Sequence, residues 1–227
     1  MKTIVIIGGS KGIGKAISNT LLDENRVINI SRSQPEFSHL NLTHYKCDIL
    51  TDELPDLEKV DTLIYCPGSI NLKPFERLKI EDFKNDYEIN FIGAVKAIQK
   101  YLPNLKATEN ANILLFSTVA SKLGMPFHTS VASVKSAIEG LVKSLAAEYA
   151  PKIRINAIAP TVTDTTLAAK LLRNDRQKEQ MIERHPLKKY LNPEEVAQMA
   201  AFLISDKAAS MSGQIFEMDC GITTFKN

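Results

Sequence analysis

The sequence predicts an α/β fold in which buried strands alternate with helices, and three observations support it. Short apolar, β-branched runs recur along the chain, and most precede a segment whose apolar residues repeat at three- and four-residue spacing. A glycine-rich segment separates the first strand from the first helix. The chain has 227 residues, which is enough for one sizeable core, and the alternation continues without a break. We therefore expect residues 1–227 to form a single domain.

Composition excludes several classes of function. With 28 basic and 26 acidic residues the net charge is +2, and no block of like charge suggests a nucleic-acid partner, so a small-molecule substrate is expected. The three cysteines, Cys47, Cys66 and Cys220, are far apart, which predicts neither a disulfide framework nor a metal site and favours a reducing, cytoplasmic setting. No leader pattern and no run of 18 apolar residues is seen, so no membrane partner is expected.

The N-terminal stretch contains the predicted strand, turn and helix start. Residues 4–7 are an apolar run typical of a strand that is buried on both faces, and Gly8, Gly12 and Gly14 follow. Gly8 would permit a tight turn, Gly12 would let the backbone approach a pyrophosphate, and the helix N-terminus would offer unpaired N–H groups. Phosphate is the predicted ligand, and a simple turn is the alternative.

The spacing G-x-x-x-G-x-G before a helix resembles the cofactor loop of the short-chain dehydrogenase/reductase family. The resemblance extends from Ile4 to Gly221, although Ile7 stands where the family usually has Thr. It implies a Rossmann-type, doubly wound, mainly parallel seven-stranded sheet with helices on both faces, which binds NAD(P). It also assigns cofactor binding to the loop residues Gly8, Ser10, Lys11, Gly12, Ile13 and Gly14.

The end of the second predicted strand, residues 26–30, carries the residues that select the cofactor. Proteins that bind NAD place Asp or Glu here to bind the ribose hydroxyls, and that carboxylate would repel a 2′-phosphate. In this chain Ser31 and Arg32 occupy the place, and Lys11 lies in the glycine loop. Two cations and no carboxylate predict NADP(H). The alternative is that both cations are solvated surface residues.

The third and fourth predicted strands, residues 44–47 and 61–65, end in segments that also resemble the family. Asp48 and Ile49 match the pair that flanks the adenine ring, and a strand-end turn is the other interpretation of Asp48. After the fourth strand the family usually has Asn-Asn-Ala-Gly, of which only Gly68 is present here. The resemblance therefore implies that the backbone at Gly68 borders the cofactor.

A long helix is predicted from Ile80 to Leu102, and it places Asn90 in an apolar stripe where a polar side chain needs a partner. In the family an Asn at this point bends the helix and holds a water in a proton relay, so the resemblance gives Asn90 both catalytic and cofactor roles. An Asn satisfied within the core is the alternative. The next strand, residues 111–116, delivers Ser117 and Thr118 at its carboxyl end, where ligands bind in a parallel sheet.

The family motif Y-x-x-x-K is present only in part. Lys135 fits the lysine, Val131 falls at the place of the catalytic tyrosine, and Thr118 falls at the place of the serine, with Ser117 beside it. Lys135 and Val131 are one helical turn apart and so share a face. The resemblance implies that Lys135 holds the cofactor ribose and that the usual proton donor is missing. Packing alone is the other interpretation of Val131.

The C-terminal third is predicted to complete the sheet and the cofactor site. Residues 153–158 and 213–216 are the sixth and seventh strands, and residues 193–203 are a helix capped by Asn192. Pro160, Val162 and Thr165 match the family segment that meets the nicotinamide carboxamide. Thr165 could equally cap a helix that begins with Leu167, and residues 167–187 have the position of the family's substrate lid.

Two classes of function remain open without the tyrosine. The first is an NADP(H)-dependent oxidoreductase acting on a small carbonyl, alcohol or quinone-like substrate, in which Lys135 acts through a water, or His128 acts, as the proton donor while Ser117 and Thr118 orient the substrate. The second is an inactive NADP(H)-binding protein that serves as a sensor or an oligomer subunit. The family's habit of pairing two helices across a two-fold axis further implies a homodimer or homotetramer.

Overall fold

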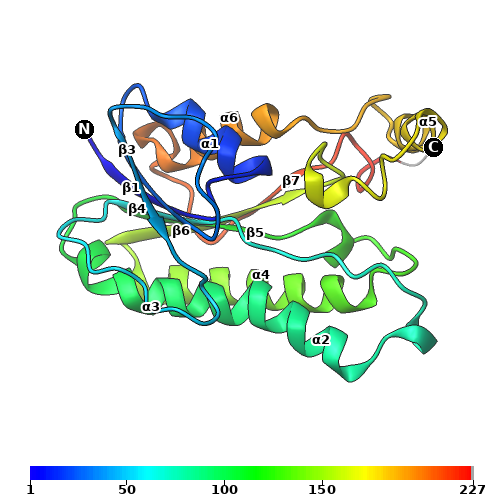
Figure 1. The fold of residues 1–227 in the computed structure, drawn as a ribbon, viewed down its shortest axis with the longest axis horizontal. Helices are drawn as coiled ribbons and strands as arrows, with labels where there is room; N and C mark the ends of the chain where they lie inside the picture. Colours follow the sequence, from blue (N-terminus) through cyan, green and yellow to red (C-terminus); the bar gives the residue numbers. More distant parts are fainter. Residues whose placement is uncertain (226–227) are drawn as a thin grey trace.

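The computed structural model describes residues 1–225, and all strand pairings within this part of the chain are parallel (Figure 1). One seven-stranded sheet has the order β3-β2-β1-β4-β5-β6-β7. Its strands are β1 (Thr3–Ile7), β2 (Arg26–Ser31), β3 (Leu42–Lys46), β4 (Thr62–Tyr65), β5 (Ala111–Phe116), β6 (Ile153–Pro160) and β7 (Ile215–Met218). The predicted doubly wound sheet is therefore confirmed.

Helices cover both faces of this sheet (Figure 1). One face carries α1 (Gly12–Leu21) and α6 (Pro193–Ile204), and the other carries α2 (Ile80–Tyr87), α3 (Gly93–Lys106) and α4 (Thr129–Tyr149). The remaining helix, α5 (Asp175–Arg184), lies beyond the carboxyl end of β7. No helix in residues 1–225 combines the length and apolar character needed to cross a membrane.

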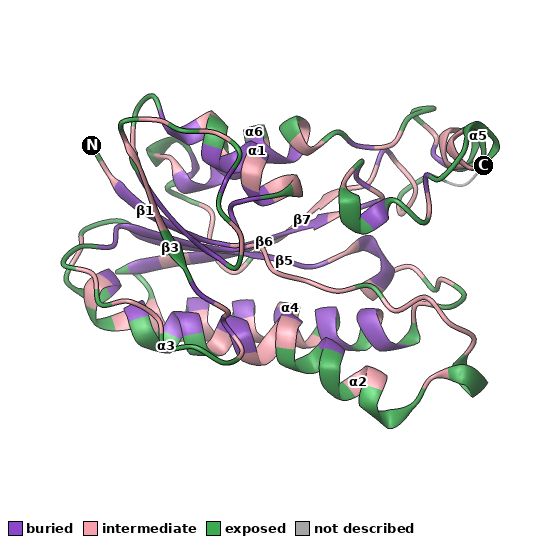
Figure 2. Cartoon of the chain, in the orientation of Figure 1, coloured by how far each residue is buried: buried purple, intermediate pink, exposed green. Residues whose placement is uncertain are grey.

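The two helix layers make two hydrophobic cores, one on each face of the sheet. Alternate residues of β1 divide between them, because Val5 and Ile7 pack on the α3 and α4 side whereas Ile4 and Ile6 pack on the α1 and α6 side. All five residues of β1 are buried, as Figure 2 shows for the centre of the sheet. Burial on both faces explains why the sequence shows a continuous apolar run there instead of an alternating one.

The strand order places a ligand-binding crevice at the ends of β1 and β4. From β1 the chain winds outward to β2 and β3, and it then returns to the other side of β1 to form β4. The direction of winding reverses between these two strands, and ligands of doubly wound sheets bind outside the carboxyl ends of the strands at such a point. The glycine turn after β1 and the Cys66–Gly68 segment after β4 both lie there.

The long helix predicted for residues 80–102 is interrupted at Asn90. A π-helical turn, Glu88–Ile92, separates α2 from α3, and α3 then continues to Lys106. Within the turn Asn90 Nδ2 donates to the backbone oxygen of Asp86 at 2.8 Å, and Tyr65 Oη donates to the backbone oxygen of Ile89 at 2.6 Å. Side chains thus satisfy carbonyl groups where the helix departs from α geometry.

Two boundaries differ from the prediction in the C-terminal third. The helix expected from Leu167 is only a 3-10 turn, Thr166–Ala168, and α5 begins at Asp175, where Asn174 Oδ1 accepts from Gln177 N at 2.9 Å. Thr165 Oγ1 accepts from Ala168 N at 3.4 Å, so the capping interpretation of this residue is correct. Strand β7 starts two residues later than expected, because Gly213 adopts φ +75° in the preceding turn.

Candidate functional site

The largest cavity at the site is a cleft of about 700 Å³ that runs over the carboxyl ends of β1, β2 and β4. Every loop residue assigned to the cofactor from the sequence lines it, together with most of the other predicted contacts. These lining residues are Gly8, Ser10, Lys11, Gly12, Ile13, Gly14, Ser31, Arg32, Asp48, Ile49, Gly68 and Thr165. Residues that are far apart in the sequence therefore meet around one elongated space.

The glycine turn has the shape that a phosphate cradle needs. Gly8 adopts φ +80°, which favours glycine, and a Cβ on Gly14 would lie 2.3 Å from the backbone oxygen of Gly8. Lys11 is the N-cap residue of α1, and its side chain makes no capping hydrogen bond. The backbone N–H groups of the first turn of α1 thus remain available at the positive end of the helix dipole.

Hydroxyl groups and cations gather at the end of the cleft formed by β2. The Ser10 and Ser31 hydroxyls are hydrogen-bonded to each other, and Ser10 Oγ also donates to the backbone oxygen of Ser33 at 2.7 Å. Lys11 and Arg32 are exposed, and neither makes an ion pair within residues 1–225. Both cations are therefore free to meet an anionic group at this end of the cleft.

Asp48 and Ile49 form a side wall of the cleft. Asp48 is half-buried, and its Oδ1 accepts from Leu50 N at 3.0 Å in a turn that follows β3. Ile49 is buried at 6 % exposure and packs in the core under α3. The structure shows the strand-end turn that was one interpretation of Asp48, and the same turn sets this pair beside the cleft.

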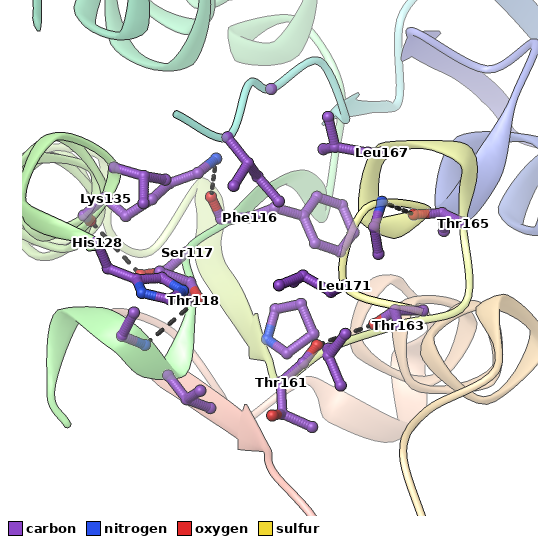
Figure 3. Close-up of a pocket in the computed structure, with 18 of the residues that line it drawn as sticks. Phe116, Ser117, Thr118, His128, Lys135, Thr161, Thr163, Thr165, Leu167 and Leu171 are labelled. Carbon is purple, nitrogen blue, oxygen red and sulfur yellow. Dashed lines mark hydrogen bonds between the residues drawn. The ribbon is translucent and has the colours of Figure 1, made fainter. Parts of the chain in front are cut away.

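A second cavity, of about 190 Å³, adjoins the cleft between the end of β5, the start of α4 and the loop after β6 (Figure 3). Lys135, His128 and Thr118 lie on one wall, and Thr161, Thr163 and Leu171 lie on the other. The cavity is lined by the other predicted site residues, by Val131, and by Thr165, which borders both cavities. These residues are Asn90, Ser117, Thr118, His128, Val131, Lys135, Pro160, Val162 and Thr165.

Lys135 is the buried cation of this cavity. Its Nζ donates to the backbone oxygen of Phe116 at 2.9 Å, and burial lowers the pKa of Lys135 to about 8. The negative charge of Asp86 opposes that effect. A Cβ placed on Gly68 would lie 3.7 Å from Lys135 Nζ and 3.1 Å from Asn90 Oδ1, so both polar atoms border the same small space.

The two hydroxyl groups after β5, those of Ser117 and Thr118, differ in whether their hydrogen is available to a ligand. Ser117 Oγ donates to Glu139 Oε1 at 2.6 Å, which directs its hydrogen to that carboxylate. Thr118 Oγ1 accepts from Ala120 N at 3.3 Å, and its own hydrogen bonds to no acceptor within the described residues. Thr118 can therefore donate to a ligand, whereas Ser117 is committed to Glu139.

His128 precedes the first residue of α4 and borders the cavity. Its Nδ1 lies 2.7 Å from the backbone oxygen of Pro126, which makes Nδ1 the protonated nitrogen. Its Nε2 has no hydrogen-bond partner in the described part of the chain. A histidine held in this way could accept a proton or, when charged, donate one.

Comparison with known proteins assigns the family. The sequence model described as enoyl-(acyl carrier protein) reductase matches residues 47–223. A tropinone reductase homolog from Arabidopsis thaliana is 32% identical over 243 residues, which cover 98% of this chain and 91% of that protein. The chain belongs to the short-chain dehydrogenase/reductase family. This confirms the predicted family and the oxidoreductase class to which its members belong.

Solved structures of the short-chain dehydrogenase/reductase family agree with the fold. The ligand-free aldohexose dehydrogenase of Thermoplasma acidophilum has a TM-score of 0.91 and 26% identity, and the match covers 99% of this chain and 95% of that one. ElxO with bound NADP has a TM-score of 0.89 and 25% identity, with 99% of both chains covered. The agreement extends over the whole of this short-chain dehydrogenase/reductase.

Sequence reasoning about this short-chain dehydrogenase/reductase missed several polar residues at the site. His185 is buried at 1 % exposure, and its Nε2 lies 2.7 Å from Thr161 Oγ1 at the wall of the smaller cavity. Asp86 is fully buried and accepts from the hydroxyls of Ser69 and Ser130. The one available signal was the spacing of Asp86 four residues before Asn90, which puts both on one helix face.

Proposed function

We propose that this chain is an NADP(H)-dependent oxidoreductase that acts on a small carbonyl, alcohol or quinone-like substrate with a proton donor other than tyrosine. The observation that carries the proposal is the meeting of two cavities at Gly68, one of about 700 Å³ that we assign to a dinucleotide and one of about 190 Å³, lined by Lys135, that we assign to a small substrate. Gly68, Cys66 and Ser69 line both cavities. A bound nicotinamide would supply or accept the hydride at this junction.

Fit to a dinucleotide is supported by the glycine turn and by ElxO, a relative whose structure holds NADP. A side chain at Gly14 would collide with the backbone of Gly8, so only glycine lets the turn pack this closely on the start of α1, and the N–H groups of the first turn of α1 suit a pyrophosphate. We infer NADP(H) over NAD(H) because Lys11 and Arg32 are cations without an ion pair among residues 1–225 and Ser31 is not an acid. Asp48 and Ile49 would flank the adenine, and Pro160, Val162 and Thr165 would hold the nicotinamide end.

The proton chemistry must come from groups other than the family's tyrosine. Val131 stands four residues before Lys135, is 5 % exposed and offers only methyl groups to the smaller cavity. In carbonyl reduction the Thr118 hydroxyl would donate a hydrogen bond to the substrate oxygen. Once the carbonyl carbon has received a hydride, that oxygen would take a proton from the Lys135 ammonium through a water, and the amine would regain a proton from solvent. Asn90 Oδ1 has no partner in the described residues and suits such a water.

His128 is the second candidate for proton donor. Its Nδ1 is fixed by the backbone of Pro126, and its Nε2 is free within the described part of the chain. Ser117 contributes less than the sequence suggested, because its hydrogen is directed to Glu139. A substrate such as a quinone, which can take its proton from solvent after hydride addition, would need neither group.

A cofactor-binding protein without turnover is the alternative, and Val131 is the observation that favours it. The side chain is buried at the wall of the smaller cavity and places methyl groups where the family has an acid. Such a protein would act as a sensor or as a subunit of a homodimer or homotetramer. Asn90 Oδ1, buried without a partner among residues 1–225, argues against this alternative, because a binder that performs no proton transfer has little use for it.

Val131→Tyr and Lys135→Met together test the proposal. NADPH consumption would be followed by absorbance across ketones, quinones and activated alkenes, with Lys143→Met as the control on an exposed lysine of the same helix. If the remaining site is intact, Val131→Tyr should raise turnover of simple carbonyls, and Lys135→Met should lower the native rate by about 10²-fold or more. If Lys135→Met still binds the cofactor and its turnover is unchanged, His128 becomes the leading candidate for proton donor. No turnover in any variant would support the binder.

A further inference from the structure

A buried carboxylate lines the larger cleft near its junction with the smaller cavity, and no step proposed above uses it. Asp86 is 0 % exposed on α2 and makes no ion pair within the described residues. Its oxygens accept from Ser69 Oγ at 2.5 Å, from Ser130 Oγ at 2.6 Å and from Asn71 Nδ2 at 3.5 Å. Burying a carboxylate is costly unless hydrogen bonds or charges compensate, so its presence here calls for a reason.

A chain of hydrogen bonds links this carboxylate to Asn90 through Ser69, and its donors and acceptors can be arranged in only one way. Ser69 has a single hydroxyl hydrogen, and Asp86 takes it, so Ser69 Oγ can only accept from Asn90 Nδ2 at 2.9 Å. The backbone oxygen of Asp86 accepts the other Nδ2 hydrogen at 2.8 Å. Both acceptors require the amide nitrogen, which leaves Asn90 Oδ1 pointing away from them.

The free oxygen of Asn90 borders the same space as Lys135. Asn90 Oδ1 is buried without a partner in the described residues, and it lies 3.1 Å from the Cβ position of Gly68, where Lys135 Nζ is at 3.7 Å. Ser130 also ties Asp86 to the first turn of α4, the helix that carries Lys135. The carboxylate thus acts on Lys135 through two elements at once.

We propose that Asp86 is a positioning residue for Lys135, because its carboxylate orients Asn90 Oδ1 through Ser69 and its negative charge favours the ammonium form of the lysine. The inference rests on the proposed function, in which Lys135 supplies the proton. Asp86 itself touches neither substrate nor hydride. In the absence of a tyrosine it provides the fixed anion that keeps a buried lysine ready to donate.

Asp86 is the principal negative charge that faces Lys135. From the segment after β4 comes Cys66, but burial raises the pKa of that thiol to about 12, so it is neutral at physiological pH. Glu139, on α4 itself, is engaged by the Ser117 and Ser121 hydroxyls, and His128 lies near the start of α4. Burial lowers the pKa of Lys135 to about 8 while the Asp86 charge opposes this effect, so removing that charge should lower the pKa further.

Asp86→Asn tests this with Asp61→Asn as the control. Asp61 is a buried carboxylate, 5 % exposed, that accepts from Thr3 N at 2.6 Å at the amino ends of β1 and β4, away from the cavities at their carboxyl ends. Two readouts are measured for each variant. They are the pH profile of kcat and the titration of Lys135 by NMR of protein with carbon-13 at lysine Cε, the signal being assigned by its loss in Lys135→Met.

We expect Asp86→Asn to move both the Lys135 titration and the alkaline limb of the kcat profile toward lower pH. The proton concentration at each midpoint should be about tenfold higher than in the wild type. At pH values above both midpoints the protonated fraction, and hence the rate, should fall by the same factor of about ten. Asp61→Asn should move neither. A Lys135 titration that Asp86→Asn leaves unchanged would overturn the inference.

Ser69→Ala provides the second test and removes no charge. It breaks the connection between Asp86 and Asn90, and we expect kcat to fall by about fivefold with the Lys135 titration nearly unchanged. If Asp86→Asn does not fold, Ser69→Ala becomes the deciding variant. An unchanged kcat in Ser69→Ala would then refute the positioning role of Asp86. Should the wild type turn over no substrate at all, the proposed function fails, and the NMR titration of the Asp86 variant still decides the inference.

Discussion

Raising the pH through about 8 should switch off carbonyl reduction, because Lys135 must carry a proton in order to donate one. The ammonium is buried at 8 % exposure, and burial lowers its pKa from the ordinary 10.5 to about 8. The charged form is therefore present below that pH and lost above it. With a pKa of about 8, the protonated fraction is about 90 % at pH 7 and about 10 % at pH 9.

The assay is kcat for NADPH consumption at saturating substrate between pH 6 and about pH 10, with the melting temperature followed in parallel. A fall of about tenfold between pH 7 and pH 9 is expected for the wild type, without loss of folded protein. Lys135→Met should keep a low rate that does not depend on pH in this range, and it should melt no lower, because a costly buried charge has been removed. A flat wild-type profile across this range would refute the assignment of Lys135.

Three further outcomes follow from the cleft and the helices. Arg32→Ala and Lys11→Ala should each weaken NADPH binding by about two- to fivefold in calorimetry and leave NADH binding unchanged, because both cations are exposed and solvent reduces their contribution; equal losses for the two cofactors would contradict the 2′-phosphate assignment. Gly14→Ala should abolish NADPH binding and lower the melting temperature, since its Cβ would lie 2.3 Å from the Gly8 oxygen, whereas Gly140→Ala, with nothing within 4 Å, should be neutral or stabilising; a tolerated Gly14→Ala would argue against the cradle. Light scattering should show a dimer or tetramer, and a monomer at micromolar concentration would count against the oligomer.

The fold was largely readable from the sequence because its signals are local. A strand buried on both faces is expected to be mostly apolar along its length, and the runs in β1, β2 and β5 are of this kind. The capping box at the start of α6 could also be predicted from the sequence, since Asn192 and Glu195 are three residues apart. The prediction was wrong for the helix at Leu167, where an apolar spacing that suits a helix forms only a 3-10 turn.

Small residues were a poor guide to the outside of the molecule. Ala94 and Ala97 are small enough to let a second helix approach, but both are fully buried in the chain's own hydrophobic core. Ala146 is buried as well, whereas Gly140 is exposed on α4. Periodicity alone does not tell which stripe of an amphipathic helix faces the core when both stripes contain small residues.

Sequence by itself determined the family, the parallel sheet, the glycine turn and the position of Lys135, because each depends on residues that are neighbours in the chain or on one helix face. Only the tertiary structure decided which polar groups are free. In the folded chain the Ser117 hydroxyl donates to Glu139. The hydroxyls of Ser69 and Ser130, which come from separate segments, both donate to Asp86. Hydrogen-bond partners and burial depend on contacts between distant segments, and these contacts exist only once the chain has folded.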